Sequence, residues 1–326
     1  MHDLTALILR RLGDGGAFVS GEVLCREFSM TRSAVWKHVA LLRRGGYVID
    51  AVPGRGYRLV RPTSLPVAEE VMPLLTTERM GRSFLYLDSI GSTNVEARRR
   101  AAAGVTEGFV VVADHQEAGR GRLGRQWFSP AGANLYWSLV LRPQLPLFRI
   151  PQVTLLLGLA VRRALREAFP ALEVMVKWPN DLFVGGRKVC GILCEMQSEP
   201  DLAHFVVAGV GVNVNVEAFP VELQGMATSL WLETGRVQSR AGLLAGMLNH
   251  FEPLYDRWLV EDDLAFVREE LAAVSFLTGR DVVLEQGSRV VSGRVCGMSE
   301  RGELLLTQAD GTVRSVASGE AQLQKS

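Results

Sequence analysis

The chain has 326 residues, of which 48% are hydrophobic, so it can bury a sizeable core and has the length of two or three domains. Its 36 basic and 35 acidic residues nearly balance, but residues 1–62 hold ten basic and five acidic residues, a local charge of +5 that leaves −4 for the rest. This asymmetry predicts a polyanionic partner for the N-terminal segment alone.

The composition also argues against a disulfide-rich, zinc-binding or membrane protein. The four cysteines form no disulfide framework, and no histidine completes a zinc set around Cys190 and Cys194. We therefore expect reduced, buried thiols and no metal held by the protein. The N-terminus lacks a signal-peptide pattern, and the most apolar stretch, Val153–Val161, is too short to span a bilayer. A cytoplasmic protein without membrane contact is expected.

The first 62 residues have the pattern of a helix-turn-helix. Ser20 is placed to cap a helix that runs to about Phe28, and Thr31 is placed to cap a second helix that ends at Gly45-Gly46. In the second helix, Val35, Val39 and Leu42 share one apolar face and should be core. The start of this helix should be exposed and should meet base edges in a DNA groove through four residues: Arg32, Ser33, Trp36 and Lys37.

Two short strands, 47–52 and 57–60, follow and predict a wing beside the two helices. The turn between them carries Arg55, and Arg58 comes shortly after it, so the hairpin is placed to touch phosphates. Two alternatives stay open: the charges only solvate a small helical domain, or the module only supports the core or contacts another protein. The local charge and the basic wing favour binding of DNA.

After a predicted linker at 63–79, the chain indicates an α+β fold in two further domains. Residues 80–272 mix strand-like and helix-like segments, as a mixed sheet with packed helices requires. From 273 to 326 the pattern changes to short strands with glycine turns, which predicts a small SH3-like β-barrel. The expected strands of the larger domain are 84–88, 109–114, 135–141, 173–177, 188–197 and 204–214, and its expected helices are 94–103, 151–168 and 240–258. In the last domain the expected strands are 281–285, 293–298, 304–307 and 312–316.

The segment Gly119–Trp127 is the most informative loop of the sequence. Its three glycines let the backbone approach a ligand closely, and its three arginines suit phosphate or carboxylate. The glycines fit GxGxxG, but no helix follows and no acidic residue lies about 20 positions on, so a dinucleotide fold is excluded. No GxxxxGK[ST] pattern occurs in the chain. On residue types alone, this segment predicts an anion-binding loop.

Four motifs in order give the sequence a clear resemblance. The loop resembles the GRGRxGRxW segment of biotin–protein ligases, and 177–181 is similar to their KWPND motif. Residues 92–94 and 209–213 are similar to the family's STN motif and GxGxN strand. The resemblance covers nearly the whole chain and is strongest to the bifunctional bacterial type, which also represses the biotin operon. It implies an ATP-dependent ligase with an N-terminal winged helix, a catalytic domain of the biotin/lipoate ligase type and a small C-terminal barrel.

The resemblance also implies a role for individual residues. The expected catalytic residues are Lys188, Arg120 and Arg122. The expected biotin-binding residues are these three with Ser92, Thr93, Asn94, Gln116 and Gly121. The expected ATP and adenylate residues are Arg122, Trp127, Lys177, Asn180, Asp181 and Asn213. A structural reading stays open for some of them: residues 92–94 also suit a helix cap, Lys188 an edge-strand charge, Trp127 core packing, and Asp181 a turn cap.

By resemblance, the substrates are biotin and ATP with Mg²⁺, and the partners are a biotin carboxyl carrier protein, operator DNA and a second copy of the chain, with a homodimer forming on binding of biotinyl-5'-AMP. One departure concerns the expected adenylate-covering loop, 216–228, which carries Phe219 and Met226 where the family often has larger aromatic residues. The nearest rivals are a lipoate–protein ligase, which lacks the GRGRxGRxW segment, and an inactive ligand-sensing transcription factor, against which the complete set of Lys188, Arg120 and Arg122 argues.

Overall fold

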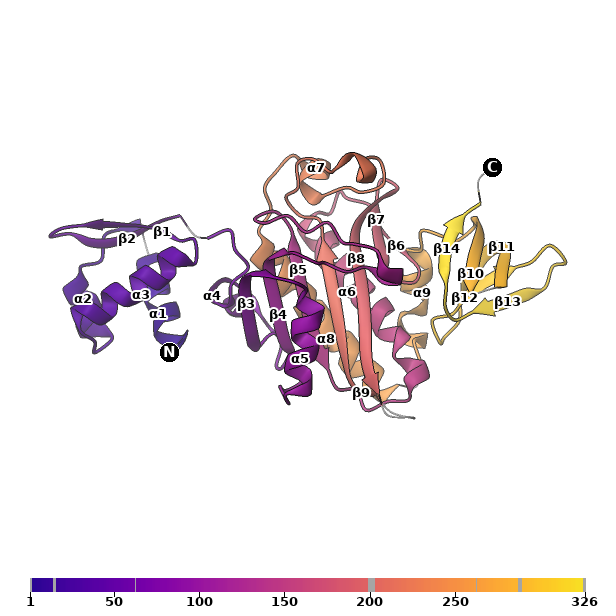
Figure 1. The fold of residues 1–326 in the computed structure, drawn as a ribbon, viewed down its shortest axis with the longest axis horizontal. Helices are drawn as coiled ribbons and strands as arrows, with labels where there is room; N and C mark the ends of the chain where they lie inside the picture. The colour runs from indigo at the N-terminus through magenta and orange to yellow at the C-terminus, as the bar shows by residue number, and fades with distance from the viewer. Residues whose placement is uncertain are drawn as a thin grey trace. The chain divides into compact units, whose positions relative to one another are not determined.

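The computed structural model describes residues 2–13, 16–61, 63–198, 203–261, 263–286 and 289–324 (Figure 1). Contacts divide the chain into two compact units, Met1–Pro73 and Leu74–Ser326. The predicted domain boundary at residue 62 lies outside the described residues, and the boundaries at 79 and 272 stay predictions. Within the described ranges, no helix is long and apolar enough to cross a membrane.

The first unit contains the predicted helix-turn-helix and wing, preceded by a helix that the sequence had not singled out. Its elements are α1 His2–Gly13, α2 Gly21–Glu27, α3 Arg32–Arg44, β1 Val48–Val52, β2 Gly56–Arg61 and α4 Ala68–Val71. Both predicted caps are confirmed: Ser20 Oγ accepts from the Val23 amide at 3.1 Å, and Thr31 Oγ1 accepts from the Ala34 amide at 3.3 Å. These side chains satisfy backbone donors that the first turn of a helix leaves free.

The core of this unit forms where α1 packs on α3. Val35, Val39 and Leu42 of α3 are buried as predicted, and α1 adds Ile8 and Leu12, both with no exposed surface. After α3 the chain turns through a glycine at position 46 with a φ of +83°, a conformation that other residues rarely adopt. The turn starts the antiparallel pair β1–β2.

A seven-stranded mixed sheet forms the centre of the second unit. Its spatial order is β3-β4-β5-β9-β8-β7-β6, and only β3 and β4 are parallel neighbours. The strands are β3 Ser83–Ile90, β4 Phe109–Gln116, β5 Leu135–Leu141, β6 Val174–Lys177, β7 Asp181–Val184, β8 Arg187–Ser198 and β9 Ala203–Val212. Six of the seven were predicted within a few residues. The sequence missed β7, which is a four-residue strand in a tight hairpin.

Helices cover both faces of this sheet. Helix α5, Thr93–Ala102, packs on β4, β5 and β9, and α6, Pro151–Ala168, packs on β6, β7 and β8. Asn94 of α5 lies against Gly209, whereas Gly158 of α6 lies near Ile192, which pairs with Val210. Since neighbouring residues of a strand point to opposite faces, α5 and α6 lie on opposite faces. Helix α8, Arg240–Val260, packs on α6, and the short α7, Leu230–Thr234, precedes it.

The last part of the chain is an antiparallel sheet. After α9, Ala265–Ala273, five strands pair in the order β13-β12-β11-β10-β14. They are β10 Asp281–Gln286, β11 Arg289–Met298, β12 Leu304–Thr307, β13 Val313–Val316 and β14 Glu320–Leu323. The sequence had missed α9 and β14. The expectation of buried thiols is wrong for Cys296 of β11, which is exposed.

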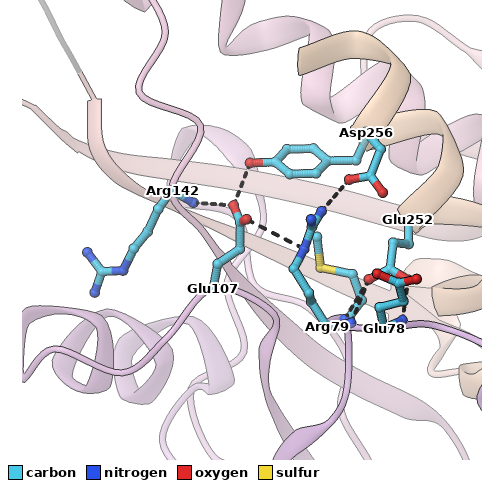
Figure 2. Close-up of polar contacts among 8 residues, drawn as sticks. Glu78, Arg79, Glu107, Arg142, Glu252 and Asp256 are labelled. Atoms are coloured by element: carbon cyan, nitrogen blue, oxygen red, sulfur yellow. Dashed lines mark hydrogen bonds and ion pairs between the residues drawn. The ribbon is translucent and has the colours of Figure 1, made fainter. Parts of the chain in front are cut away.

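A cluster of polar groups near the start of this unit holds residues 78–80 against helix α8 (Figure 2). The buried carboxylate of Glu252, on α8, accepts hydrogen bonds from the backbone amides of Glu78, Arg79 and Met80. Arg79 also pairs with Asp256, one helical turn further along α8. A buried carboxylate is tolerated here because three amide donors replace its water.

Candidate active site

A cavity of about 540 Å³ opens on the α5 face of the central sheet. It has the size of an ordinary small-molecule site. Its lining includes all the residues that the sequence assigned to biotin and to the adenylate: Ser92, Thr93, Asn94, Gln116, Arg120, Gly121, Arg122, Trp127, Lys177, Asn180, Asp181, Lys188 and Asn213. Residues separated by up to 121 positions in the chain therefore meet in one place.

Three glycines make the floor of this cavity. Gly191 of β8 pairs across the sheet with Gly211 of β9, and Gly209 lies two residues before Gly211. A methyl group on Gly211 would lie 2.5 Å from Nε1 of Trp127, and one on Gly191 would lie 2.9 Å from Cζ3 of the same ring. Glycine within a strand often marks the close approach of another group. Here it lets the Trp127 indole lie directly on the sheet.

The position of Trp127 is compatible with both interpretations that the sequence left open. One side of its ring packs on the glycine floor, and the residue also lines the cavity. Its indole N–H is buried and has no hydrogen-bond partner among the described residues. Buried donors are rarely left unpaired, so this N–H is a candidate donor to a bound ligand.

One end of the cavity is polar but uncharged. Gln116 Oε1 accepts from the Thr93 backbone N at 2.9 Å and lies 3.1 Å from Thr93 Oγ1, and Gln116 Nε2 donates to Ser129 Oγ at 3.2 Å. Ser92 occupies the N-cap position of α5, but its side chain makes no capping bond. The cap interpretation therefore holds for the backbone alone, and the Ser92 hydroxyl is left for another partner.

The other end of the cavity is cationic. Lys188 Nζ lies 2.7 Å from Asp181 Oδ1 and 5.3 Å from the centre of a Trp127 ring. Lys177 Nζ lies 5.3 Å from the centre of the Phe183 ring, and burial lowers the pKa of this lysine below its ordinary value. An anion beside these two lysines would be bound in a partly desolvated place, where charge interactions are stronger than in water.

The arginine–glycine loop lies over the cationic end. Arg122 donates to Asn180 Oδ1 at 3.0 Å and to the Gly319 carbonyl at 3.2 Å, which ties the loop to the KWPND turn and to the C-terminal sheet. The Arg120 side chain is exposed. The Gly121 amide donates to the Arg125 carbonyl at 2.8 Å, so the backbone donor of this expected biotin-binding residue is used within the loop.

Asn213 lines the cavity but uses its amide for the scaffold. Its Nδ2 donates to the Thr228 carbonyl at 3.0 Å, and its Oδ1 accepts from Asn134 at 3.3 Å. These bonds hold one end of the 216–228 loop. The backbone of Lys188 holds the same part of the loop as a neighbouring strand would: Lys188 N donates to Met226 O, and Thr228 N donates to Lys188 O, each at 2.9 Å.

The two loop side chains that depart from the family pattern are placed differently. Phe219 is buried, with its ring centre 6.1 Å from that of Phe128, whereas Met226 is exposed. Both line the cavity. The loop therefore lines the cavity with one aromatic side chain and one flexible thioether, together with Leu223 and Ala227.

Several lining residues were not predicted. Arg125 Nη1 pairs with Glu320 Oε1 of β14 at 2.6 Å, and Ala321 follows Glu320 at the cavity wall. Gly191 was missed although it is a glycine inside a strand, which is a signal of close approach. β14 has only four residues, two of them polar, so the sequence carried no signal that it reaches the site.

The first unit holds the predicted DNA-contacting residues. Arg32, Ser33, Trp36 and Lys37 are exposed at the start of α3, as expected for a recognition helix. Arg58 pairs with Asp50 at 2.7 Å and lies 4.7 Å from the centre of the Phe18 ring, and Arg55 lies 4.3 Å from that ring centre. Arg55 is exposed, whereas Arg58 is half-buried. In the described ranges, no group of three His, Cys, Asp or Glu residues could hold a metal ion.

Comparison with known families gives three matches along the chain. The HTH domain model matches residues 5–58, the biotin/lipoate A/B protein ligase family matches residues 86–213, and the biotin protein ligase C terminal domain matches residues 278–323. Their order agrees with the predicted order of a DNA-binding module, a ligase core and a small β domain. The predicted α+β architecture is confirmed.

Individual relatives agree with these matches. The bifunctional ligase/repressor BirA of Bacillus spizizenii is 37% identical over 315 residues, which is 95% of each chain. The protein of the same name in Escherichia coli (strain K12) is 32% identical over 309 residues, 95% of this chain and 94% of its own. A structure of biotin protein ligase from Aquifex aeolicus in complex with biotin and ATP has a TM-score of 0.66 and 31% identity, and covers 75% of this chain and 100% of its own.

Proposed function

Because this chain belongs to the biotin/lipoate A/B protein ligase family, in its bifunctional ligase/repressor form, we propose that it uses ATP to attach biotin to a lysine of a carrier protein and that it represses genes of biotin biosynthesis. The enzyme is an ATP-dependent biotin–protein ligase. Its substrates are biotin and ATP with Mg²⁺.

One observation carries the assignment of the site: a single cavity has an uncharged polar end and a cationic end. Biotin has the matching polarity, with a neutral ureido ring at one end and a carboxylate at the other. Ser92, Thr93 and Gln116 suit the ring because they offer neutral donors and acceptors. Lys188 and Lys177 suit the carboxylate and the phosphate of ATP.

The chemistry follows from bringing two anions together. A carboxylate oxygen of biotin attacks the α-phosphorus of ATP, and pyrophosphate leaves with its bonding electron pair. The lysine amine of the carrier then attacks the acyl carbon of biotinyl-5'-AMP, and AMP leaves. Neither step needs a nucleophile from the protein, so the main tasks of the site are neutralising charge and aligning the reacting groups.

The proposed roles of individual residues follow their positions. Lys188 and Arg122 neutralise the reacting carboxylate and phosphate, and Arg120 joins them when the loop folds over the ligand. Trp127 packs against the adenylate and donates its free indole N–H. Asn180 and Asp181 orient Arg122 and Lys188 through the contacts described above. Asn213 supports the covering loop rather than touching the ligand.

For the repressor role, we propose that α3 enters the major groove of operator DNA and that Arg55 contacts the backbone. Paired half-sites require a two-fold protein, so we propose a homodimer that is favoured by biotinyl-5'-AMP. The carrier is proposed to be the biotin carboxyl carrier protein of acetyl-CoA carboxylase. This agrees with a relative from Paracoccus denitrificans that is named biotin–[acetyl-CoA-carboxylase] ligase.

Transfer to a carrier tests the ligase assignment. Purified protein with ATP, Mg²⁺ and biotin should label the carrier at its acceptor lysine, detected with streptavidin after denaturing electrophoresis. A carrier with that lysine replaced by arginine is the control and should stay unlabelled. Lipoate in place of biotin should leave the mass of the intact carrier unchanged in mass spectrometry; a carrier modified by lipoate and not by biotin would assign the site to the rival substrate.

A further inference from the structure

The Asn94 side chain is held in a notch of the sheet by a row of polar groups. Ser138 of β5, Gly209 of β9 and Leu193 of β8 lie side by side in the sheet register, and the Asn94 amide fills the space that Gly209 leaves empty. Asn94 Oδ1 accepts from Ser138 Oγ at 2.6 Å. Asn94 Nδ2 donates to the Leu193 carbonyl at 3.1 Å and to Glu195 Oε2 at 2.8 Å.

This arrangement allows only one orientation of the amide. A carbonyl oxygen and a carboxylate can only accept hydrogen bonds, so the NH₂ group of Asn94 must face Leu193 and Glu195. Turned over, the amide oxygen would lie against both acceptors. The Ser138 hydroxyl is compatible with either orientation of the amide, because a hydroxyl can donate or accept a hydrogen bond. Glu195 is the only charged group in the row, and bonds to charged groups are the stronger ones.

The orientation of the amide sets what Thr93 offers to the cavity. Ser138 has a single hydroxyl proton and lies 2.6 Å from Asn94 Oδ1 and 2.8 Å from Thr93 Oγ1. Asn94 Oδ1 has no proton to offer, so it takes the proton of Ser138, and the proton of the Thr93 hydroxyl then fills the 2.8 Å contact between the two hydroxyls. The Thr93 oxygen can therefore only accept from a ligand in the cavity. With the amide reversed, Asn94 would donate to Ser138 and Ser138 to Thr93, which would free the Thr93 proton to face Gln116 or the ligand. The ureido ring of biotin has two N–H donors, and an acceptor at Thr93 suits one of them.

We propose that Glu195 is a positioning residue for the ring of biotin: through the Asn94 amide it fixes the direction of the hydrogen bonds that end at Thr93. The proposal rests on the assignment of the cavity to biotin. It also revises the expectation for Asn94, whose amide hydrogens are both committed to the protein. Asn94 forms the wall of the ring site and transmits the orientation that Glu195 sets.

Steady-state kinetics of pyrophosphate exchange, with calorimetric titration of biotin, test this role. Glu195→Ala should raise KM for biotin about tenfold and leave kcat and KM for ATP within about twofold, because binding of the ring is weakened and the cationic end is untouched. In Glu195→Gln the KM for biotin should rise much less, since the new amide oxygen still accepts a hydrogen bond from Asn94. Glu269→Ala removes an exposed carboxylate of α9 and serves as the matched control.

A double variant separates positioning from a merely structural role. Asn94→Asp should raise KM for biotin roughly a hundredfold, because its carboxylate faces Glu195 and the Leu193 carbonyl. Adding Glu195→Gln supplies an NH₂ donor to that carboxylate and should lower the KM for biotin at least about fivefold relative to Asn94→Asp alone. Equal KM values for Asn94→Asp with and without Glu195→Gln, or an unchanged KM in Glu195→Ala, would overturn the proposal. A wild-type chain that binds no biotin would instead overturn the proposed function, and this inference with it.

Discussion

Gly211 is the residue on which the shape of the cavity depends most directly. Gly211→Ala would place a methyl group 2.5 Å from the Trp127 indole, which is rigid and cannot move aside cheaply. We expect biotin-dependent pyrophosphate exchange to fall at least tenfold, with a shift in tryptophan fluorescence. Gly158→Ala on α6 is the control, because its methyl group meets Val176 at an ordinary 3.7 Å and favours the helix by up to about 1 kcal/mol. Equal activity in both variants would show that Trp127 is not held as described.

Lys177 gives the site a pH dependence with a defined sign. Burial lowers its pKa below the ordinary 10.5, so its ammonium loses its proton at a lower pH than an exposed lysine would. Pyrophosphate exchange should therefore decline as pH rises through that lowered pKa, and Lys177→Arg should remove this limb because a guanidinium stays charged. Coincident pH–rate profiles would contradict this role.

The stability of the protein should respond to Lys177 in the opposite sense. Between the lowered pKa of the folded state and the ordinary value, the unfolded chain binds more protons than the folded chain. The free energy of unfolding therefore rises with pH in that window and gains nothing further above it. The difference in unfolding free energy between the wild type and Lys177→Arg, followed in urea, measures this contribution.

At the residue scale, the sequence predicted which residues meet and missed how they use their hydrogen bonds. All thirteen assigned residues line the cavity because the motifs end at one edge or one face of the sheet. The side-chain amides of Asn94 and Asn213 and the backbone amide of Gly121 donate to other groups of the protein. The identity of a residue does not reveal which partner its amide will have. Glu195 was overlooked because its importance comes from a partner 101 positions away in the chain.

At the scale of elements, the long buried segments were predicted well, whereas two short strands, β7 and β14, and the helix α9 were missed. α6 and β5 were predicted at their observed limits, since β5 is buried along its whole length, α6 has a long apolar face, and both are bounded by proline or polar turns. β7 and β14 have four residues each, so a period could not reveal them, although the equally short β6, β12 and β13 were predicted. Their positions depend on pairing with distant strands, which local propensity does not record.

β14 brings an ion pair to the arginine–glycine loop, and this pair should matter little for stability. Arg125 and Glu320 lie 2.6 Å apart, with the arginine side chain 64% exposed. Exposed pairs contribute at most about 1 kcal/mol, so Glu320→Ala should change the free energy of unfolding by less than that. Glu300→Ala, which breaks the exposed Arg268–Glu300 pair, is the comparison. A loss of several kcal/mol on denaturation in urea would mean that β14 is held mainly through this contact.

For the whole molecule, the division into two compact units predicts two separable activities. The double variant Arg32→Ala with Lys37→Ala should weaken operator binding and flatten its salt dependence, because two cations of the DNA surface are lost. Pyrophosphate exchange should keep its wild-type rate, since both residues belong to the first unit and the cavity to the second. Gel shifts at several salt concentrations measure the first effect; unchanged operator affinity would contradict the assignment of α3.

The central claim is that one cavity binds biotin beside ATP and joins them. Biotin-dependent exchange of labelled pyrophosphate into ATP measures that step alone, without carrier or DNA. The wild-type chain should exchange label only when biotin is present, and Lys188→Ala should reduce the rate at least a hundredfold, by loss of the ammonium beside the reacting anions, while keeping the fold. Exchange that ignores biotin, or a Lys188→Ala variant as fast as the wild type, would contradict the account.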